Sequence, residues 1–263
     1  MSQMKVELID HMGNDYSPIR AAIVSNGVTD SSKYIDDDLR FTPAAHSLIN
    51  FLARGCTAGD WASVTDSLVN RTAEEIEEIE DVLNYVRHMP PHWTPFGHTA
   101  ITVYVKAPIF VARQLGKHQV GFVWNEISRR YVDKQPEFYR PDVWRGRSAD
   151  KKQGSDGVIY YNYEKFMHET ERRSFGVDQV CLEQYRDMLS AGVAPEQARM
   201  VLPQSTMTEW YWSGSLDAFA SMCQLRCKPD TQYESRLVAD QISEKMGELF
   251  PVSWAALMGG KDD

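Results

Sequence analysis

The chain has 263 residues, 43% of them hydrophobic and 25% charged, which is enough for a substantial core and argues against dominant disorder. The formal net charge of −9 argues against broad contact with a nucleic acid polymer but is compatible with a small anionic ligand. No apolar run approaches the roughly 20 residues of a membrane span, and the N-terminus lacks a signal-peptide core, so we expect a cytoplasmic protein without a membrane partner.

The first third of the chain is predicted to contain one strand followed by helices. Residues 5–10 have a strand-like composition, and residues 17–25 form a predicted short helix. A second helix is predicted over residues 43–55. The clearest amphipathic pattern lies at 72–89, where a capping box precedes apolar residues at helical spacing.

The rest of the chain mixes few strands with many helices. Strands are predicted at 100–107 and 205–212, and helices at 108–115, 178–192, 195–202, 216–226 and 231–250. Residues 140–158 are polar and rich in Gly, Asp and Lys, and we interpret them as a surface loop inserted within one domain that spans residues 1–263. Without regular βαβ alternation, the pattern favours an α+β (mixed α/β) fold.

Common catalytic motifs are missing from the sequence. There is no phosphate-binding glycine loop and no GxSxG motif, and His88, His92, His98 and His118 are irregularly spaced, so we expect no metal site. Several arginines, among them Arg130, Arg199 and Arg226, lie beside apolar residues. They could recognise a phosphate or a planar ring, or pair with the abundant carboxylates, and their spacing alone leaves both interpretations open.

Several long segments carry a more specific signal. They are VELIDHMGNDYSPIRAA, WTPFGHTAITVYVKAPIFVARQ, NEISRRY with PEFY after it, and GVAPEQARMVLPQSTMTEWYW followed by LR and QYE. In these segments the chain resembles the flavin-dependent thymidylate synthase family (ThyX). The resemblance implies a ThyX-like fold, with a small central sheet surrounded by helices, and a homo-oligomer, typically a tetramer whose sites lie between subunits.

The resemblance also implies a reaction. The family transfers a one-carbon unit from methylenetetrahydrofolate to C5 of dUMP, and reduced FAD, replenished from NADPH, supplies the hydride that completes dTMP. Cationic side chains polarise the pyrimidine, and no cysteine nucleophile is needed. The implied ligands are therefore a pyrimidine deoxynucleotide monophosphate, a folate and FAD.

Most nucleotide-binding positions of the family are matched. They correspond here to Gln114, Glu126, Ser128, Arg130, Arg199 and Arg226. The resemblance implies that Arg199 and Arg226 are catalytic and lie near the pyrimidine, and that Ser128 and Arg130 lie near the phosphate. His92 matches a position on the folate side of the cavity.

The flavin-binding positions are less well matched. The family signature is Arg-His-Arg, seven residues, then Ser, whereas this chain has Lys117, His118, Gln119, eight residues, then Ser128. Asp217 replaces an arginine in the segment SGSLDAFAS, and Gly97 replaces a glutamate. The flavin contacts expected from the resemblance are Thr94, Lys117, His118, Gln119, Ser215 and Ser221. Loss of two cations predicts weaker attraction to a pyrophosphate, unless Lys117, Arg129 or the 140–158 loop compensates.

Two alternatives remain open from the sequence. One is hydroxymethylation of dUMP or dCMP, which requires no net reduction and would therefore tolerate an altered flavin site. Such a reaction would suit a viral nucleotide pathway in a host cytoplasm. The other is a nucleotide-binding homologue without catalysis, although retention of Arg199 and Arg226 counts against it.

Overall fold

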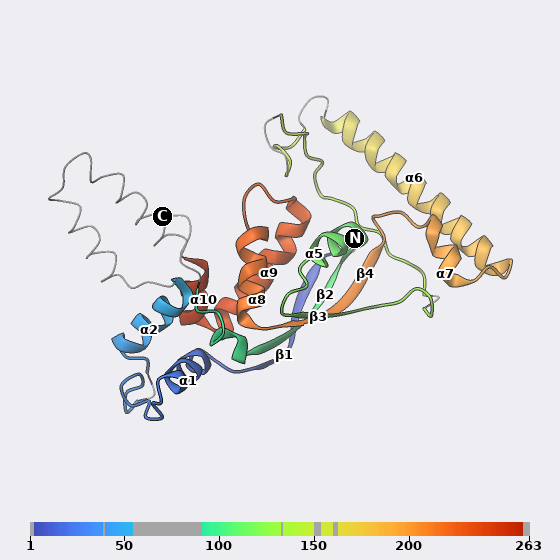
Figure 1. Cartoon of the computed structure of the whole chain (residues 1–263). Coiled ribbons are helices and arrows are strands. Elements are labelled where there is room, and N and C mark those ends of the chain that lie inside the picture. The colour runs from blue at the N-terminus through green and yellow to red at the C-terminus, as the bar shows by residue number, and fades with distance from the viewer. Residues whose placement is uncertain are drawn as a thin grey trace, which may run out of the picture. The chain divides into compact units, whose positions relative to one another are not determined.

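The computed structural model describes residues 3–38, 40–54, 91–132, 134–149, 154–159 and 163–259 (Figure 1). The helix predicted at 72–89 lies outside these ranges. The chain divides into two compact units, each assembled from three segments. The first unit comprises residues 1–9, 102–213 and 222–242, and the second comprises residues 10–101, 214–221 and 243–263. The single domain expected from the sequence stays a prediction.

A four-stranded antiparallel sheet, most of which belongs to the first unit, has the strand order β1-β2-β4-β3 (Figure 1). The strands are β1 (Lys5–Met12), β2 (Ala100–Pro108), β3 (Phe122–Glu126) and β4 (Met207–Gly214). Side chains alternate along β2 and β4, so that Val103, Val105, Trp210 and Trp212 are buried. The opposite face is more exposed, as expected for an antiparallel sheet with one face on the core.

Strand β3 was not predicted from the sequence. Aromatic packing fixes it at the edge of the sheet: the rings of Trp124 and Trp210 stack at 4.4 Å between centroids, and those of Phe122 and Trp212 lie 4.7 Å apart. Val123, which points to the other face, is 71% exposed. The strand is short, and its position depends on partners about 90 residues later in the chain, which a local pattern does not reveal.

The helices of the first unit include α5 (Ile109–Leu115), α6 (Tyr163–Ser190), α7 (Pro195–Ala198) and the 3-10 turn η2 (Arg199–Val201). Helix α6 begins well before the predicted residue 178. Helices α8 (Leu216–Arg226) and α9 (Tyr233–Leu249) contribute residues to both units. Within the described ranges, no helix is long and apolar enough to cross a bilayer.

The second unit is helical and contains α1 (Tyr16–Ser25), α2 (Pro43–Arg54), the 3-10 turn η1 (Phe96–His98) and α10 (Pro251–Met258). Helix α10 packs against α2, and α1 packs against α2 and η1. The buried carboxylate of Asp15 accepts hydrogen bonds from the backbone N–H groups of Val252 at 2.8 Å and Ser253 at 2.7 Å. Asp15 therefore satisfies the free N–H groups at the start of α10.

Candidate functional site

All six expected nucleotide-binding residues belong to the first unit. Gln114 lies in α5, Glu126 ends β3, Ser128 and Arg130 follow β3, Arg199 begins η2, and Arg226 ends α8. Lys117, His118 and Gln119 follow α5 in the same unit. The other expected ligand contacts, which are His92, Thr94, Ser215 and Ser221, belong to the second unit.

Arg226 is held in place by His118. The Nε–H of Arg226 donates to Nε2 of His118 at 2.9 Å, and Arg226 is only 9% exposed. Burial, followed by the nearby charge of Arg226, lowers the pKa of His118. His118 is therefore neutral at physiological pH and can accept this bond. The contact uses the Nε–H of Arg226 and leaves its two terminal nitrogens to contact a ligand.

Gln114 is also held by a neighbouring helix. The Oγ–H of Ser235, a fully buried residue of α9, donates a hydrogen bond to Oε1 of Gln114. Ser235 follows directly after the QYE segment quoted above. This bond fixes the carboxamide and leaves its NH₂ group as a donor.

A second group of expected residues lies around the end of β3. Glu126 accepts hydrogen bonds from Thr208 Oγ1 at 2.6 Å and from Trp124 Nε1 at 3.2 Å. Arg130 Nε donates to Ser128 Oγ at 3.2 Å. Thr208 belongs to β4, so the bond between Thr208 and Glu126 connects the end of β3 to the neighbouring strand.

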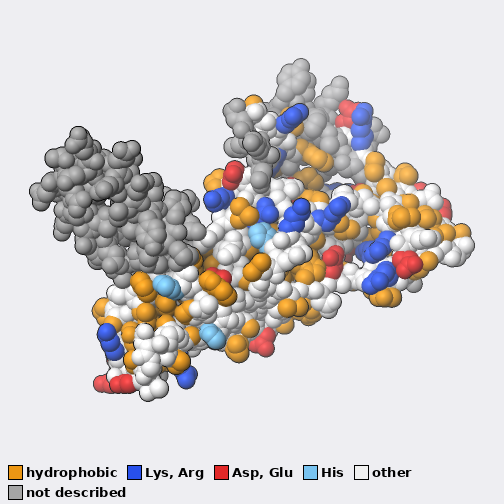
Figure 2. All heavy atoms as spheres, viewed as in Figure 1, with side chains coloured by type: hydrophobic (Ala, Val, Ile, Leu, Met, Phe, Trp, Pro, Cys, Tyr) orange, Lys and Arg blue, Asp and Glu red, His pale blue; other side chains and the backbone are white. Residues whose placement is uncertain are grey.

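The expected nucleotide residues do not close around a ligand within one chain. Glu126, Arg130 and Arg199 are exposed, and Arg199 Nε donates to the carbonyl oxygen of Glu196 at 3.2 Å. In the described part of the chain, the only hydrogen-bonded pairs among the expected site residues are His118 with Arg226 and Ser128 with Arg130. Lys and Arg side chains nevertheless gather on the viewed face over α5, despite the net charge of −9 (Figure 2).

The expected flavin residues of the second unit fit that cofactor only in part. Ser215 Oγ accepts a hydrogen bond from the N–H of Ala218 at 3.3 Å and so caps α8. Asp217 follows in the first turn, where a carboxylate suits the helix dipole, and burial raises its pKa. This carboxylate does not fit a pyrophosphate. His92 is exposed, with its ring 5.1 Å from that of Phe51, while Thr94 and Ser221 are exposed too.

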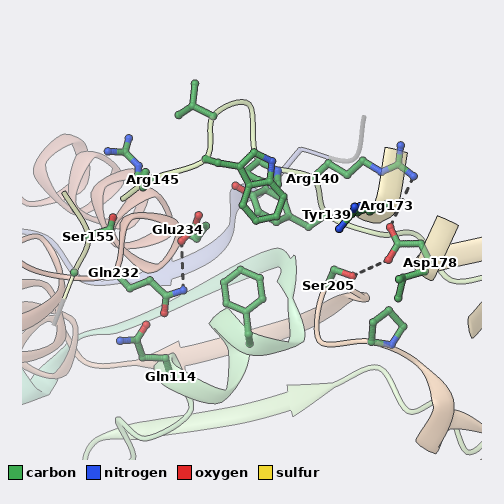
Figure 3. A pocket seen from close by; sticks show the side chains of 17 residues that line it. Gln114, Tyr139, Arg140, Arg145, Ser155, Arg173, Asp178, Ser205, Gln232 and Glu234 are labelled. Carbon is green, nitrogen blue, oxygen red and sulfur yellow. Dashed lines mark hydrogen bonds and ion pairs between the residues drawn. The ribbon is translucent and has the colours of Figure 1, made fainter. Parts of the chain in front are cut away.

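The first unit also contains a pocket of about 830 Å³ (Figure 3). Among the described residues expected at the site, Gln114 alone lines it. Figure 3 shows two polar ends: Arg145, Ser155, Gln232, Glu234 and Gln114 lie at one end, and Arg140, Arg173, Asp178 and Ser205 at the other. Its apolar lining includes Phe110, Tyr139 and Trp144. A pocket of this size can enclose a small organic ligand.

Asp178 organises the second polar end of the pocket. It is buried, accepts a hydrogen bond from Ser205 Oγ at 3.1 Å, and lies 3.8 Å from a terminal nitrogen of Arg140. Burial raises its pKa, while Ser205 and Arg140 act in the opposite direction. The sequence analysis missed these residues because three separate segments bring them together. The one local signal was the arginine that directly follows PEFY.

Comparison with known proteins shows to which family the chain belongs. The family model described as "Thymidylate synthase complementing protein" matches residues 39–252. A flavin-dependent thymidylate synthase of Thermus thermophilus is 32% identical over 252 residues, which cover 95% of this chain and 74% of that protein. The chain belongs to this family. A second member, the flavin-dependent thymidylate synthase of Thermosipho africanus, is 28% identical over 257 residues, covering 96% of this chain and 90% of the relative.

Solved structures support the same assignment of the fold. The crystal structure of the UMP/dUMP methylase PolB from Streptomyces cacaoi, bound with 5-Br dUMP, matches with a TM-score of 0.72 and 26% identity. The match covers 100% of this chain and 98% of PolB. The ThyX-like α+β fold expected from the sequence is therefore confirmed, and family membership accounts for the long matched segments.

Proposed function

We propose that the protein methylates C5 of a pyrimidine nucleoside monophosphate and converts dUMP to dTMP. The observation that carries this proposal is Arg226: a buried guanidinium held by His118, at the family's ring-activating position. Methylenetetrahydrofolate is the proposed one-carbon donor. The full-length likeness to a UMP/dUMP methylase supports the same reaction.

The proposed role of Arg226 follows from electrostatics. C5 becomes nucleophilic enough to attack the one-carbon unit when electron density in the pyrimidine ring is raised, as in the form that has lost its N3 proton, whose negative charge lies on the ring carbonyl oxygens. A preorganised guanidinium stabilises that charge without having to reorient. Arg199 assists from η2, and Gln114, Glu126, Ser128 and Arg130 bind the rest of the nucleotide.

FAD is the proposed redox cofactor, with NADPH as its reductant. When bound, reduced flavin supplies the hydride that turns the transferred methylene group into a methyl group. Lys117 and Gln119, both exposed beside His118, are the proposed contacts in the first unit, while Asp217 weakens the attraction of the second unit for a pyrophosphate. We therefore expect FAD to bind, but less tightly than it would if Asp217 were an arginine.

We also propose that the site is completed by another copy of the chain in a homo-oligomer, as in the tetramers typical of the family. Large apolar side chains are exposed beside the expected nucleotide residues: Val120 is 92%, Val123 71%, Tyr131 77% and Met200 74% exposed. Apolar exposure of this kind marks an interaction surface. Burial of these side chains by a second copy would also enclose Arg130 and Arg199.

UMP is a second candidate substrate. A structure of the same PolB protein bound with 5-Br UMP matches with a TM-score of 0.72 and 25% identity, so a related fold accepts the ribonucleotide. Hydroxymethylation of dUMP or dCMP and a purely nucleotide-binding role are less well supported, because the relatives reported above are synthases or methylases.

The test is a product analysis. The purified protein is incubated with methylenetetrahydrofolate, NADPH, FAD and, separately, dUMP, UMP or dCMP, and each product is identified by mass. We expect a methylated product that depends on FAD. A hydroxymethylated product formed without NADPH, or no product from any nucleotide, would refute the proposal.

A further inference from the structure

The pocket of the first unit contains groups that the proposed reaction leaves without a role. Arg145 and Trp144 come from the 140–158 segment, which the sequence analysis interpreted as a surface loop. Neither was expected by its own position to contact the nucleotide, the folate or the flavin, although the 140–158 loop as a whole was considered as a replacement for the lost flavin-binding cations.

The two arms of the segment pair with each other. Arg145 and Val158 form an antiparallel bridge, with hydrogen bonds from Gly146 N to Gly157 O at 3.0 Å and from Ile159 N to Trp144 O at 3.3 Å. The segment packs closely against the backbone of Asp230 at Gly154. The φ angle of Gly154 is +82°, and a Cβ atom at this position would lie 2.5 Å from the carbonyl oxygen of Asp230, so a side chain would not fit there. The backbone at Arg145 is therefore held by the hydrogen bonds between the two arms and by the close packing at Gly154, so the segment forms a defined part of the pocket lining.

Arg145 has an unused donor inside this wall. Its guanidinium carbon lies 3.7 Å from the ring centroid of Tyr233, which fixes the plane of the group. Its Nε–H is buried and finds no acceptor in the described part of the chain. Buried donors are normally satisfied, so this one is suited to an acceptor supplied by a ligand.

Tyr139 adds a second donor to the lining of the same pocket. Burial and then the charge of Glu234 raise the pKa of Tyr139, so its hydroxyl stays protonated at neutral pH. The backbone N–H of Tyr139 donates to Ser205 O at 2.7 Å. Tyr139 lines the pocket between its two polar ends (Figure 3).

The remaining wall is aromatic. Phe110 packs against Tyr139 with ring centroids 6.1 Å apart, and Trp144 lines the same cavity. Flat apolar walls suit a planar ring, and a guanidinium with a free N–H suits an anionic oxygen. We propose that this pocket binds a planar heteroaromatic molecule carrying a phosphate or carboxylate, with Arg145 as its anion contact and Trp144 against its ring.

Three molecules of the proposed reaction share this chemistry: the nucleotide, the folate and FAD. This choice of candidates rests on the proposed function, whereas the pocket itself does not. The test is isothermal titration of dUMP, 5-formyltetrahydrofolate and FAD into the wild-type protein and into Arg145→Gln. Arg147→Gln is the matched control, because Arg147 lies two residues along the same segment, is exposed and does not line the pocket.

We expect Arg145→Gln to raise the Kd of one of the three ligands about tenfold or more, as for loss of a charged hydrogen bond. Arg147→Gln should leave all three values unchanged, and the ligand that responds identifies the occupant. Trp144→Leu, which removes the ring without removing a charge, should weaken the same ligand. If Arg145→Gln lowers the thermal midpoint of unfolding, its binding data cannot be separated from loss of folding, and Trp144→Leu then provides the test.

The pocket assignment is wrong if Arg145→Gln and Trp144→Leu bind all three ligands as the wild type does, or if the wild type binds none of them. These outcomes are separable from failure of the proposed function. A wild-type protein that binds a ligand through Arg145 but methylates no nucleotide would refute the reaction and retain the pocket. An active wild type whose variants bind normally would refute the pocket alone.

Discussion

Removing the imidazole of His118 tests how far Arg226 depends on its partner. The bond between Arg226 Nε and His118 Nε2 is 2.9 Å long and joins a charged donor to a neutral acceptor. Such bonds contribute roughly 1.5–3 kcal/mol. Arg226 is only 9% exposed, so little water is available to replace the acceptor. If the bond fixes Arg226 for ring activation, His118→Ala should lower kcat/KM by roughly ten- to a hundredfold.

A glutamine at this position separates the hydrogen bond from the ring. The side-chain oxygen of glutamine can occupy a place close to that of Nε2 and accept from Arg226. His118→Gln should therefore keep activity within about tenfold of the wild type, while His118→Ala should not. Initial rates of dTMP formation at saturating FAD, with dUMP varied, give kcat and KM for each variant. His46→Gln, on the exposed side of α2, is the control for replacing a histidine elsewhere.

The pH dependence supplies a second readout. Burial and Arg226 lower the pKa of His118, so its neutral form persists below the usual histidine range. Protonation would remove the acceptor and place two cations in contact. Wild-type kcat should fall as the pH drops through this lowered pKa, and His118→Gln should lack that fall. If the glutamine and alanine variants are equally impaired, or if alanine has no effect, the positioning role is wrong.

Three further changes follow from the contacts described. Asp15→Asn keeps one acceptor oxygen for two backbone N–H groups at the start of α10, so it should lower the free energy of unfolding by about 1–3 kcal/mol in a urea titration; an unchanged midpoint would contradict the capping role. Val123→Glu places a charge on an exposed apolar strand position and should lower the mass measured by light scattering, provided that β3 lies in an oligomer interface. Asp217→Asn should lower the Kd of FAD by roughly threefold or more in a fluorescence titration, because it removes a repelling charge; a weaker complex would show that Asp217 aids binding.

Local patterns were sufficient for most helices and for three strands. The alternation of Val103 and Val105 predicted β2, and α8 was predicted over the residues that it occupies. Strand β3 was missed, as described above, and so were helix α10 and the start of α6. Helix α10 is apolar on all sides, so it has no helical period to detect, and the polar first half of α6 lacks the apolar stripe by which its start could have been recognised.

The candidate site also has parts that the sequence predicted and parts that it did not. Resemblance identified Gln114 and Arg226 one position at a time, but it did not reveal that Ser235 and His118 hold them. These partners lie more than 100 residues away in the chain, and hydrogen bonds of that kind depend on the fold. The pocket around Arg145 was missed for a further reason. A polar, glycine-rich segment is typical of a surface loop, and its sequence does not reveal that Gly154 packs against the backbone of Asp230, so that the segment lines a pocket.

The altered flavin signature makes sense once these contacts are considered together. Of its three residues, the arginines at both flanks are replaced by Lys117 and Gln119, which are exposed, while His118 is retained. His118 is also the one member bonded to Arg226. A flavin contact alone would not explain why this position keeps its family residue when its neighbours do not, whereas a bond to Arg226, the arginine proposed to activate the ring, would explain it. The retained histidine is therefore better understood as part of the nucleotide site, and dUMP binding should weaken in His118→Ala even when no flavin is present. Titration of dUMP into the flavin-free protein measures this directly, and an unchanged Kd would return His118 to the flavin site.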